Sequence, residues 1–162
     1  MRESATINPP RGWLKLFFKI PVVVARCGLS GWERLIGVEW MLLTTIGRKS
    51  GKKRHAMVDV LLYEKESDTY FIEAGFGKRS DWYRNIQAHP VFEAQVGRRK
   101  FLATAEMLPS ERSADVMLNF IQRRPKYAES VLKMVNIKFT SEEEFRRMAA
   151  QWVLLSVRPH TE

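Results

Sequence analysis

Five cations lie within eight consecutive residues, GRKSGKKR, at positions 47–54 of the 162-residue chain. Two glycines, Gly47 and Gly51, permit a tight turn, and successive amides in such a turn can form an anion-binding nest. Ser50 adds a hydroxyl, arginine gives forked contacts to phosphate, and lysine gives point charges. The stretch therefore predicts a site for an anionic ligand. A solvated basic loop is the plain alternative. The cations are Arg48, Lys49, Lys52, Lys53 and Arg54.

A second stretch, AGFGKRSDWYRN at positions 74–85, combines glycines, cations and aromatic residues. Gly75 and Gly77 allow the backbone to approach a flat ligand closely. Lys78 supplies a positive charge beside them, and an aromatic pair begins at Trp82. Such aromatic residues can equally belong to the core. The stretch therefore predicts a second part of a ligand site, with core packing as the alternative for Trp82.

Other kinds of site find less support in the sequence. The basic stretch is neither a P-loop nor a dinucleotide-binding fingerprint. Three scattered histidines and one cysteine, Cys27, give no metal-ligand spacing, so we expect no metal site. A single cysteine cannot form an internal disulfide, which fits a reducing, cytoplasmic location.

The net charge of +9 raises the question of nucleic acid. Basic patches at 48–54, 98–100 and 123–126 could face phosphates. However, no helix-turn-helix, zinc finger or RNA-binding aromatic signature accompanies them. We therefore expect a small anionic ligand and no nucleic-acid partner.

The N-terminal region contains an apolar stretch, GWLKLFFKIPVVVA, at residues 12–25. Lys15, Lys19 and Pro21 interrupt it, and it is shorter than the roughly 20 apolar residues that span a bilayer. A helix packed against the protein is the favoured interpretation, and peripheral membrane contact is the alternative. We expect an apolar helical segment at 1–38, followed by one cofactor-binding domain at 39–162.

The hydrophobic pattern predicts six strands, at 40–46, 56–63, 70–74, 91–96, 100–107 and 152–157. It predicts helices at 81–88, capped by Ser80, and at 110–124. A third helix should be capped by Thr140 or Ser141, because Glu144 lies three residues after Ser141, as in a capping box. Strands and helices do not alternate as a parallel sheet requires. The expected fold is therefore a mainly β, antiparallel barrel with peripheral helices.

The order and spacing of three segments resemble the deazaflavin-dependent nitroreductase family. The segments are LLTTIGRKSGKKR at 42–54, AGFGKRSDWYRNIQAHP at 74–90, and the predicted hairpin at 91–107. The resemblance implies a split β-barrel like that of FMN-binding flavin reductases and pyridoxamine phosphate oxidases. It also implies coenzyme F-420, an 8-hydroxy-5-deazaflavin with a phosphate and an acidic oligoglutamate tail.

The resemblance also implies roles for individual residues. Residues that would hold the phosphate and tail are Arg48, Lys49, Ser50, Gly51 and Arg54. Residues that would line the deazaflavin ring are Gly75, Phe76, Gly77, Lys78 and Trp82. Tyr127 resembles a substrate-side tyrosine, the one candidate catalytic residue. The family's second tyrosine is replaced by Ser130, and the glycine stretch is shorter, so activation of nitroimidazoles is not implied.

The implied reaction is hydride transfer from the reduced coenzyme to a quinone, an enone or a nitro compound. Two other functions remain open at this point: an FMN-dependent reductase on the same fold, and a non-catalytic carrier of lipid, haem or cofactor. Split barrels of this kind are often homodimers. Asp59, in an apolar strand, is either a functional carboxylate or a residue that faces solvent or an arginine.

Overall fold

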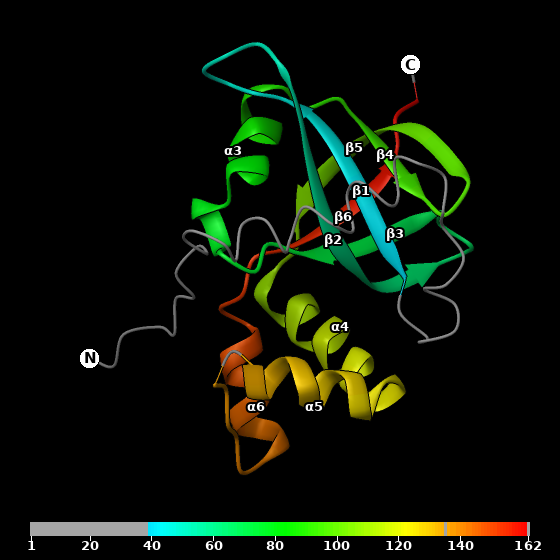
Figure 1. Ribbon diagram of the computed structural model, residues 1–162. Helices are drawn as coiled ribbons and strands as arrows, with labels where there is room; N and C mark the ends of the chain where they lie inside the picture. The colour runs from blue at the N-terminus through cyan, green and yellow to red at the C-terminus, as the bar shows by residue number, and fades with distance from the viewer. Residues whose placement is uncertain (1–38, 135, 162) are drawn as a thin grey trace.

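The computed structural model describes residues 39–134 and 136–161. The segment expected to be helical at 1–38, with its stretch 12–25, lies outside the described residues. Six antiparallel strands close into a barrel in the order β1-β2-β3-β6-β5-β4, as Figure 1 shows. The predicted antiparallel barrel is thereby confirmed. The strands are β1 Trp40–Ile46, β2 Lys53–Glu64, β3 Thr69–Glu73, β4 Phe92–Val96, β5 Arg99–Met107 and β6 Leu154–Pro159.

The interior of the barrel is apolar because alternate residues of each strand point inward. Met41 and Leu43 of β1 are fully buried in this core, together with Ile72 of β3. β1 pairs with β2 on one side and with β4 on the other, so neither of its edges is open. The β4–β5 hairpin turns at Gly97, whose φ of +55° favours glycine.

Three helices cover part of the barrel's outer face and form a second core. They are α4 Ser110–Arg123, α5 Pro125–Met134 and α6 Glu142–Ala149, and Figure 1 shows them gathered on one side of the barrel. Phe120 of α4 and Phe145 of α6 pack in this core with Phe71 of β3. The barrel and these helices are therefore joined by continuous apolar packing.

The described elements differ from the predicted ones at their ends. β2 begins at Lys53 rather than at residue 56, because its pairing with β1 continues to the pair Ile46 and Lys53. β6 begins at Leu154, because the amide of Trp152 still bonds to the last turn of α6. Helix α5 was not predicted, and it starts at Pro125, a residue that suits the first helical position.

The predicted capping box at the start of α6 is confirmed. Ser141 Oγ accepts a 3.2 Å bond from the Glu144 amide, and Glu144 in turn accepts a 2.8 Å bond from the Thr140 amide.

On the other side of the barrel, a 3₁₀ turn at Gly77–Arg79 leads into α3, Asp81–Ala88, which packs on β1 and β2. In the part of the chain that the structure describes, no helix is both long and apolar enough to cross a bilayer.

Candidate cofactor site

The basic loop, residues 47–54, forms the tip of the β1–β2 hairpin and the first residues of β2. The Gly47 carbonyl accepts bonds from the amides of Ser50 (3.0 Å) and Gly51 (2.8 Å). Gly51 has a φ of +64°, and a Cβ at Gly47 would lie 2.7 Å from Ser50 Oγ. The turn therefore favours glycine at Gly51, and a side chain at Gly47 would displace the Ser50 hydroxyl. The loop has a defined backbone shape because its own hydrogen bonds hold it.

The amides of the loop are largely used within the protein. Ser50 Oγ accepts bonds of 3.4 Å from the Lys52 amide and from the Arg54 guanidinium. The Arg48 amide bonds outward to Asn85. This geometry favours contacts to an anion from side chains rather than from an amide nest.

Four cations of the loop face solvent. Their side chains are exposed, and none of the ion pairs within 39–134 and 136–161 includes them. Like charges held this close repel one another, and a bound polyanion would relieve that repulsion. The cations are Lys49, Lys52, Lys53 and Arg54.

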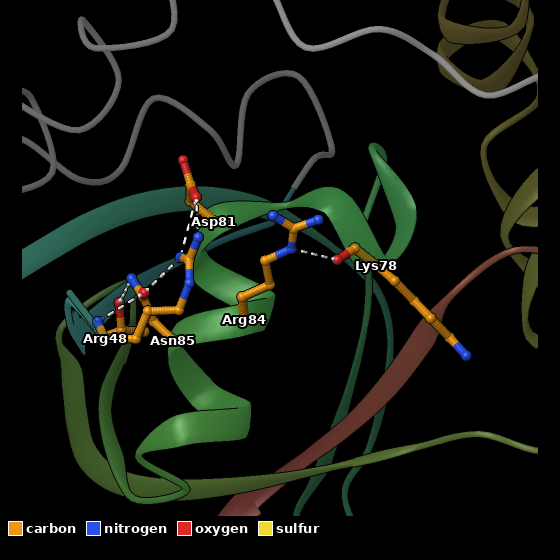
Figure 2. A network of polar contacts seen from close by, with 6 residues as sticks. Arg48, Lys78, Asp81, Arg84 and Asn85 are labelled. Carbon is orange, nitrogen blue, oxygen red and sulfur yellow. Dashed lines mark hydrogen bonds and ion pairs between the residues drawn. The ribbon is translucent and has the colours of Figure 1, made fainter.

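Arg48 is placed differently from the other cations of the loop. Its guanidinium lies between two residues of α3, as Figure 2 shows, while Lys78 extends away from this group. Nη1 donates bonds of 3.1 Å to Asp81 Oδ1 and to Asn85 Oδ1, and Nη2 donates another to Asp81. The structure therefore connects the basic loop to α3 through Arg48.

The glycine segment, residues 74–80, runs from the end of β3 to the start of α3. Gly75 is exposed, and a Cβ there would meet nothing within 4 Å, so the backbone is open to a ligand. Gly77 needs its glycine because its φ is +56°. The Lys78 side chain is exposed, while its carbonyl accepts a 3.1 Å bond from Arg84. Phe76 is half-buried within the segment.

Helix α3 begins at the predicted residue, but its cap differs from the prediction. Ser80 occupies the N-cap position, yet its hydroxyl makes no capping bond and is buried without a hydrogen-bonding partner among the described residues. Its amide bonds to the Gly77 carbonyl and so continues the 3₁₀ turn. Trp82 is half-buried and packs against the barrel core, beside Tyr83. Its ring is therefore partly a core residue.

Tyr127 lies on α5 and forms a separate polar cluster with β2. Its hydroxyl donates a 2.7 Å bond to Asp59 Oδ2, and Arg124 donates to the Val60 carbonyl next to Asp59. Burial raises the pKa of Asp59, although bonds from Tyr127 and Trp40 oppose the rise. Burial, and then the negative charge of Asp59, raise the pKa of Tyr127 above its usual value.

Glu73, at the end of β3, is the second carboxyl of this cluster. Burial and the nearby charge of Asp59 raise its pKa to about 7. Among the described residues, no hydrogen bond or ion pair joins Tyr127 to the basic loop or to the glycine segment. The Ser130 hydroxyl, at the position of the family's second tyrosine, bonds to the Lys126 carbonyl of its own helix.

Sequence reasoning missed Asn85, which connects α3 to the basic loop. A signal was present: Asn85 follows Trp82 by three residues and precedes Ile86, so it lies on the buried face of an amphipathic helix. A polar side chain on such a face needs a hydrogen-bonding partner. The sequence did not reveal which residue that partner is.

The closed antiparallel barrel with its late helices is the split β-barrel predicted from the sequence. Residues 20–136 match a family described as F420H(2)-dependent quinone reductase, and the chain belongs to this family. The predicted resemblance to deazaflavin-dependent enzymes is thereby confirmed.

Two individual relatives have the same description as this family. The chain is 35% identical over 69 residues to F420H(2)-dependent quinone reductases of two Mycobacterium tuberculosis strains. The match covers 41% of this chain and 44% of each relative, so it spans less than half the length of these curated relatives.

Two solved structures are also similar to the chain. An F420-H2 dependent reductase is 24% identical, with a TM-score of 0.48, over 73% of this chain and 91% of that one. A pyridoxamine 5'-phosphate oxidase-related, FMN-binding protein from Nostoc punctiforme is 13% identical, also with a TM-score of 0.48. That match covers 96% of this chain and 82% of that one.

Proposed function

We propose that the chain is an oxidoreductase that transfers a hydride from reduced coenzyme F-420 to an electron-poor acceptor. Its membership of the F420H(2)-dependent quinone reductase family supports this function. The observation that carries the proposal is the set of four exposed cations on an ordered hairpin tip beside α3. A phosphate with an acidic tail is the ligand that fits such a set.

The loop residues divide between binding and shaping in this proposal. Lys49 and Arg54 contact the phosphate and the tail through their side chains, with help from the neighbouring lysines. Ser50 and Gly51 hold the loop in the conformation that presents those cations, since both amides bond to the Gly47 carbonyl. The exposed cations lose little hydration in the free protein, and their attraction for the tail falls as salt rises.

The glycine segment holds the ring in this proposal. The open space at Gly75 admits a flat group against the backbone, and Gly77 allows the turn that follows. Lys78 supplies positive charge there. Phe76 and Trp82 border the same segment with apolar surface. The reduced deazaflavin supplies the hydride when it is bound, and the protein orients the acceptor against it.

Tyr127 is the proposed catalytic residue on the acceptor side. Its hydroxyl donates to Asp59 in the free protein. When Asp59 is protonated, its carboxyl can donate to Tyr127, and the tyrosine hydroxyl can then donate to an oxygen of the acceptor. Because the pKa values of Asp59 and Glu73 are raised, these carboxyls hold a proton at higher pH than ordinary carboxyls. A proton could pass from Asp59 through Tyr127 to the reduced acceptor. Water is the alternative proton source.

A quinone is the favoured acceptor, because the relatives from Mycobacterium tuberculosis are F420H(2)-dependent quinone reductases. Enones and nitro compounds remain further candidates.

A cytoplasmic location is proposed from the single cysteine. Packing of residues 12–25 against the protein is favoured over peripheral membrane contact, and a homodimer is a further proposal. Liposome sedimentation tests the first, and light scattering tests the second.

The test of the proposed function is oxidation of the reduced coenzyme by a soluble quinone under anaerobic conditions, followed by absorbance. The proposal expects turnover that depends on the protein, with no turnover from reduced FMN. Turnover with reduced FMN alone would assign the chain to the FMN-dependent alternative. Tight binding of the deazaflavin without turnover of any of the three acceptor classes would make it a non-catalytic carrier.

A further inference from the structure

The side-chain amide of Asn85 is buried, with only 3% of the residue exposed. A buried carboxamide is costly unless its donors and acceptor are satisfied. Its Oδ1 accepts bonds of 3.1 Å from the amide and from Nη1 of Arg48, and its Nδ2 donates a 3.3 Å bond to Thr45 Oγ1. Two of these bonds reach Arg48 of the basic loop, and the third reaches Thr45, near the end of β1 just before the loop. None of them serves α3 itself.

The same bonds reach both sides of the hairpin base. Thr45 is the partner of Arg54 in the β1–β2 register, and its hydroxyl lies 3.5 Å from the Arg54 carbonyl. Asn85 therefore contacts Arg48 directly and reaches Arg54 through Thr45. These two residues begin and end the run of five cations.

The part-buried bonds from Arg48 to Asn85 matter more to this arrangement than the ion pair of Arg48 does. The Asp81 side chain is 84% exposed, and exposed ion pairs contribute little because water and salt screen them. The Arg48 side chain is only 24% exposed and directs its donors toward α3. Arg48 is thus unlike the other four cations of the loop, which face solvent.

We propose that Asn85 is a positioning residue that fixes the basic loop against α3, and that Arg48 takes part in this fixing instead of binding the cofactor. The bonds of Asn85 with Arg48 and Thr45 are called the latch below. The proposal rests on the proposed function, and it narrows the anion-binding set to Lys49, Lys52, Lys53 and Arg54. The latch also fixes the distance between the basic loop and the glycine segment, which precedes α3 in the chain. A loop held in place before binding loses less entropy when a ligand arrives.

The first test replaces Asn85 and measures deazaflavin affinity by fluorescence and kcat at saturating cofactor. Asn85→Leu removes every bond of the carboxamide and should weaken binding about tenfold, with kcat little changed. Asn85→Asp keeps the acceptor for Arg48 and should stay within about threefold of the wild type. Gln87→Leu, on the exposed face of the same helix, is the matched control. Unchanged affinity in folded Asn85→Leu would overturn the proposal.

A double-mutant cycle with Arg48→Met separates the latch from two independent effects. If both residues act through one latch, the double variant should bind about as weakly as the worse single variant. If the two residues act independently, the loss of affinity in the double variant should equal the product of the two single losses, to within about twofold. Multiplying losses would show that Arg48 acts independently of Asn85, and that part of the proposal would fail.

Hydrogen exchange on the ligand-free protein tests the latch without any cofactor. The amides of Ser50 and Gly51 should exchange faster in Asn85→Leu and in Arg48→Met, while those of the β4–β5 hairpin should not change. Unchanged loop exchange in both variants would overturn the latch. Because this readout needs no ligand, it decides the latch even if the wild type binds no deazaflavin and the proposed function fails.

Discussion

The Tyr127 hydroxyl donates a 2.7 Å hydrogen bond to Asp59 Oδ2, joining α5 to β2 across 68 residues of sequence. The bond is part-buried, and the first turn of α5 carries it. Asp59 is also the register partner of Trp40 on β1, and Trp40 bonds to it as well. A tyrosine held in this way has a fixed orientation, which is what a substrate-side residue requires.

Tyr127→Phe should lower kcat for quinone reduction by about tenfold to a hundredfold, a modest share of what general acid–base groups contribute. The affinity for the deazaflavin should not change, because no bond joins Tyr127 to the described residues of the basic loop. Steady-state kinetics with a soluble quinone measures the first quantity, and fluorescence titration measures the second. An unchanged kcat would exclude Tyr127 as the catalytic residue.

Asp59→Asn separates charge from hydrogen bonding in the same pair. The amide oxygen can still accept the bond from Tyr127, but the carboxyl proton is lost. If Asp59 relays a proton, kcat should fall to about the level of Tyr127→Phe, since either change breaks one route. Tyr63→Phe is the control, because Tyr63 donates a similar 2.9 Å bond to Asp68 at the β2–β3 turn. Its kcat should equal that of the wild type.

Glu73 should make the folded state less stable as the pH rises. Its pKa is about 7 in the folded protein, above the usual 4.5, so the folded state holds the extra proton between these values. The stability that Glu73 contributes is then fully present below about pH 4.5 and is lost as the pH rises through about 7. Glu73→Gln should raise the free energy of unfolding at pH 8 by about 1–2 kcal/mol, with no gain near pH 4. The gain is smaller than the full pKa shift would give, because Glu73 is only half-buried and water screens its charge.

Urea unfolding at both pH values measures this effect. Glu66→Gln, at an exposed turn position, is the matched control and should change stability equally little at either pH. A gain for Glu73→Gln of the same size at pH 4 and pH 8 would show that Glu73 does not titrate in this range.

Gly75→Ala tests whether a flat ligand lies on the glycine segment. The added methyl meets nothing within 4 Å in the free protein, so the melting temperature should stay the same. It would nonetheless occupy the space proposed for the ring, and the deazaflavin Kd should rise about tenfold. Differential scanning fluorimetry and titration check the two parts. An unchanged Kd would place the ring elsewhere.

The sequence predicted those features that depend on neighbouring residues. The apolar run of β1, the cation-rich hairpin tip and the capping box at Ser141 each have a local signal, and the structure contains all three. The antiparallel barrel could also be predicted, because the expected strands do not alternate with helices along the chain. Helix α5 was missed although Pro125 suits a helix start, because the short segment after α4 lacked an evident apolar period.

The contacts that position the site were not predictable, because they join residues far apart in sequence. Arg48 has the composition of a phosphate ligand, yet its guanidinium bonds to Asp81 and Asn85, 33 and 37 residues away. Asp59 was expected to face solvent or an arginine, or to serve a function. It bonds to Tyr127, which the sequence did not indicate, and Arg124 lies near enough to lower its pKa. Such pairings follow from the closed barrel rather than from any local pattern.

The central claim is that the exposed cations of the basic loop hold a deazaflavin by its acidic groups. The most direct test is fluorescence titration with coenzyme F-420, and separately with FMN, of the wild type, Lys49→Ala, Arg54→Ala and a control, Lys65→Ala, from the exposed β2–β3 turn. We predict micromolar or tighter deazaflavin binding that each loop variant weakens about tenfold and the control does not. Equal deazaflavin affinity in all four proteins, or binding of FMN alone, would contradict the claim.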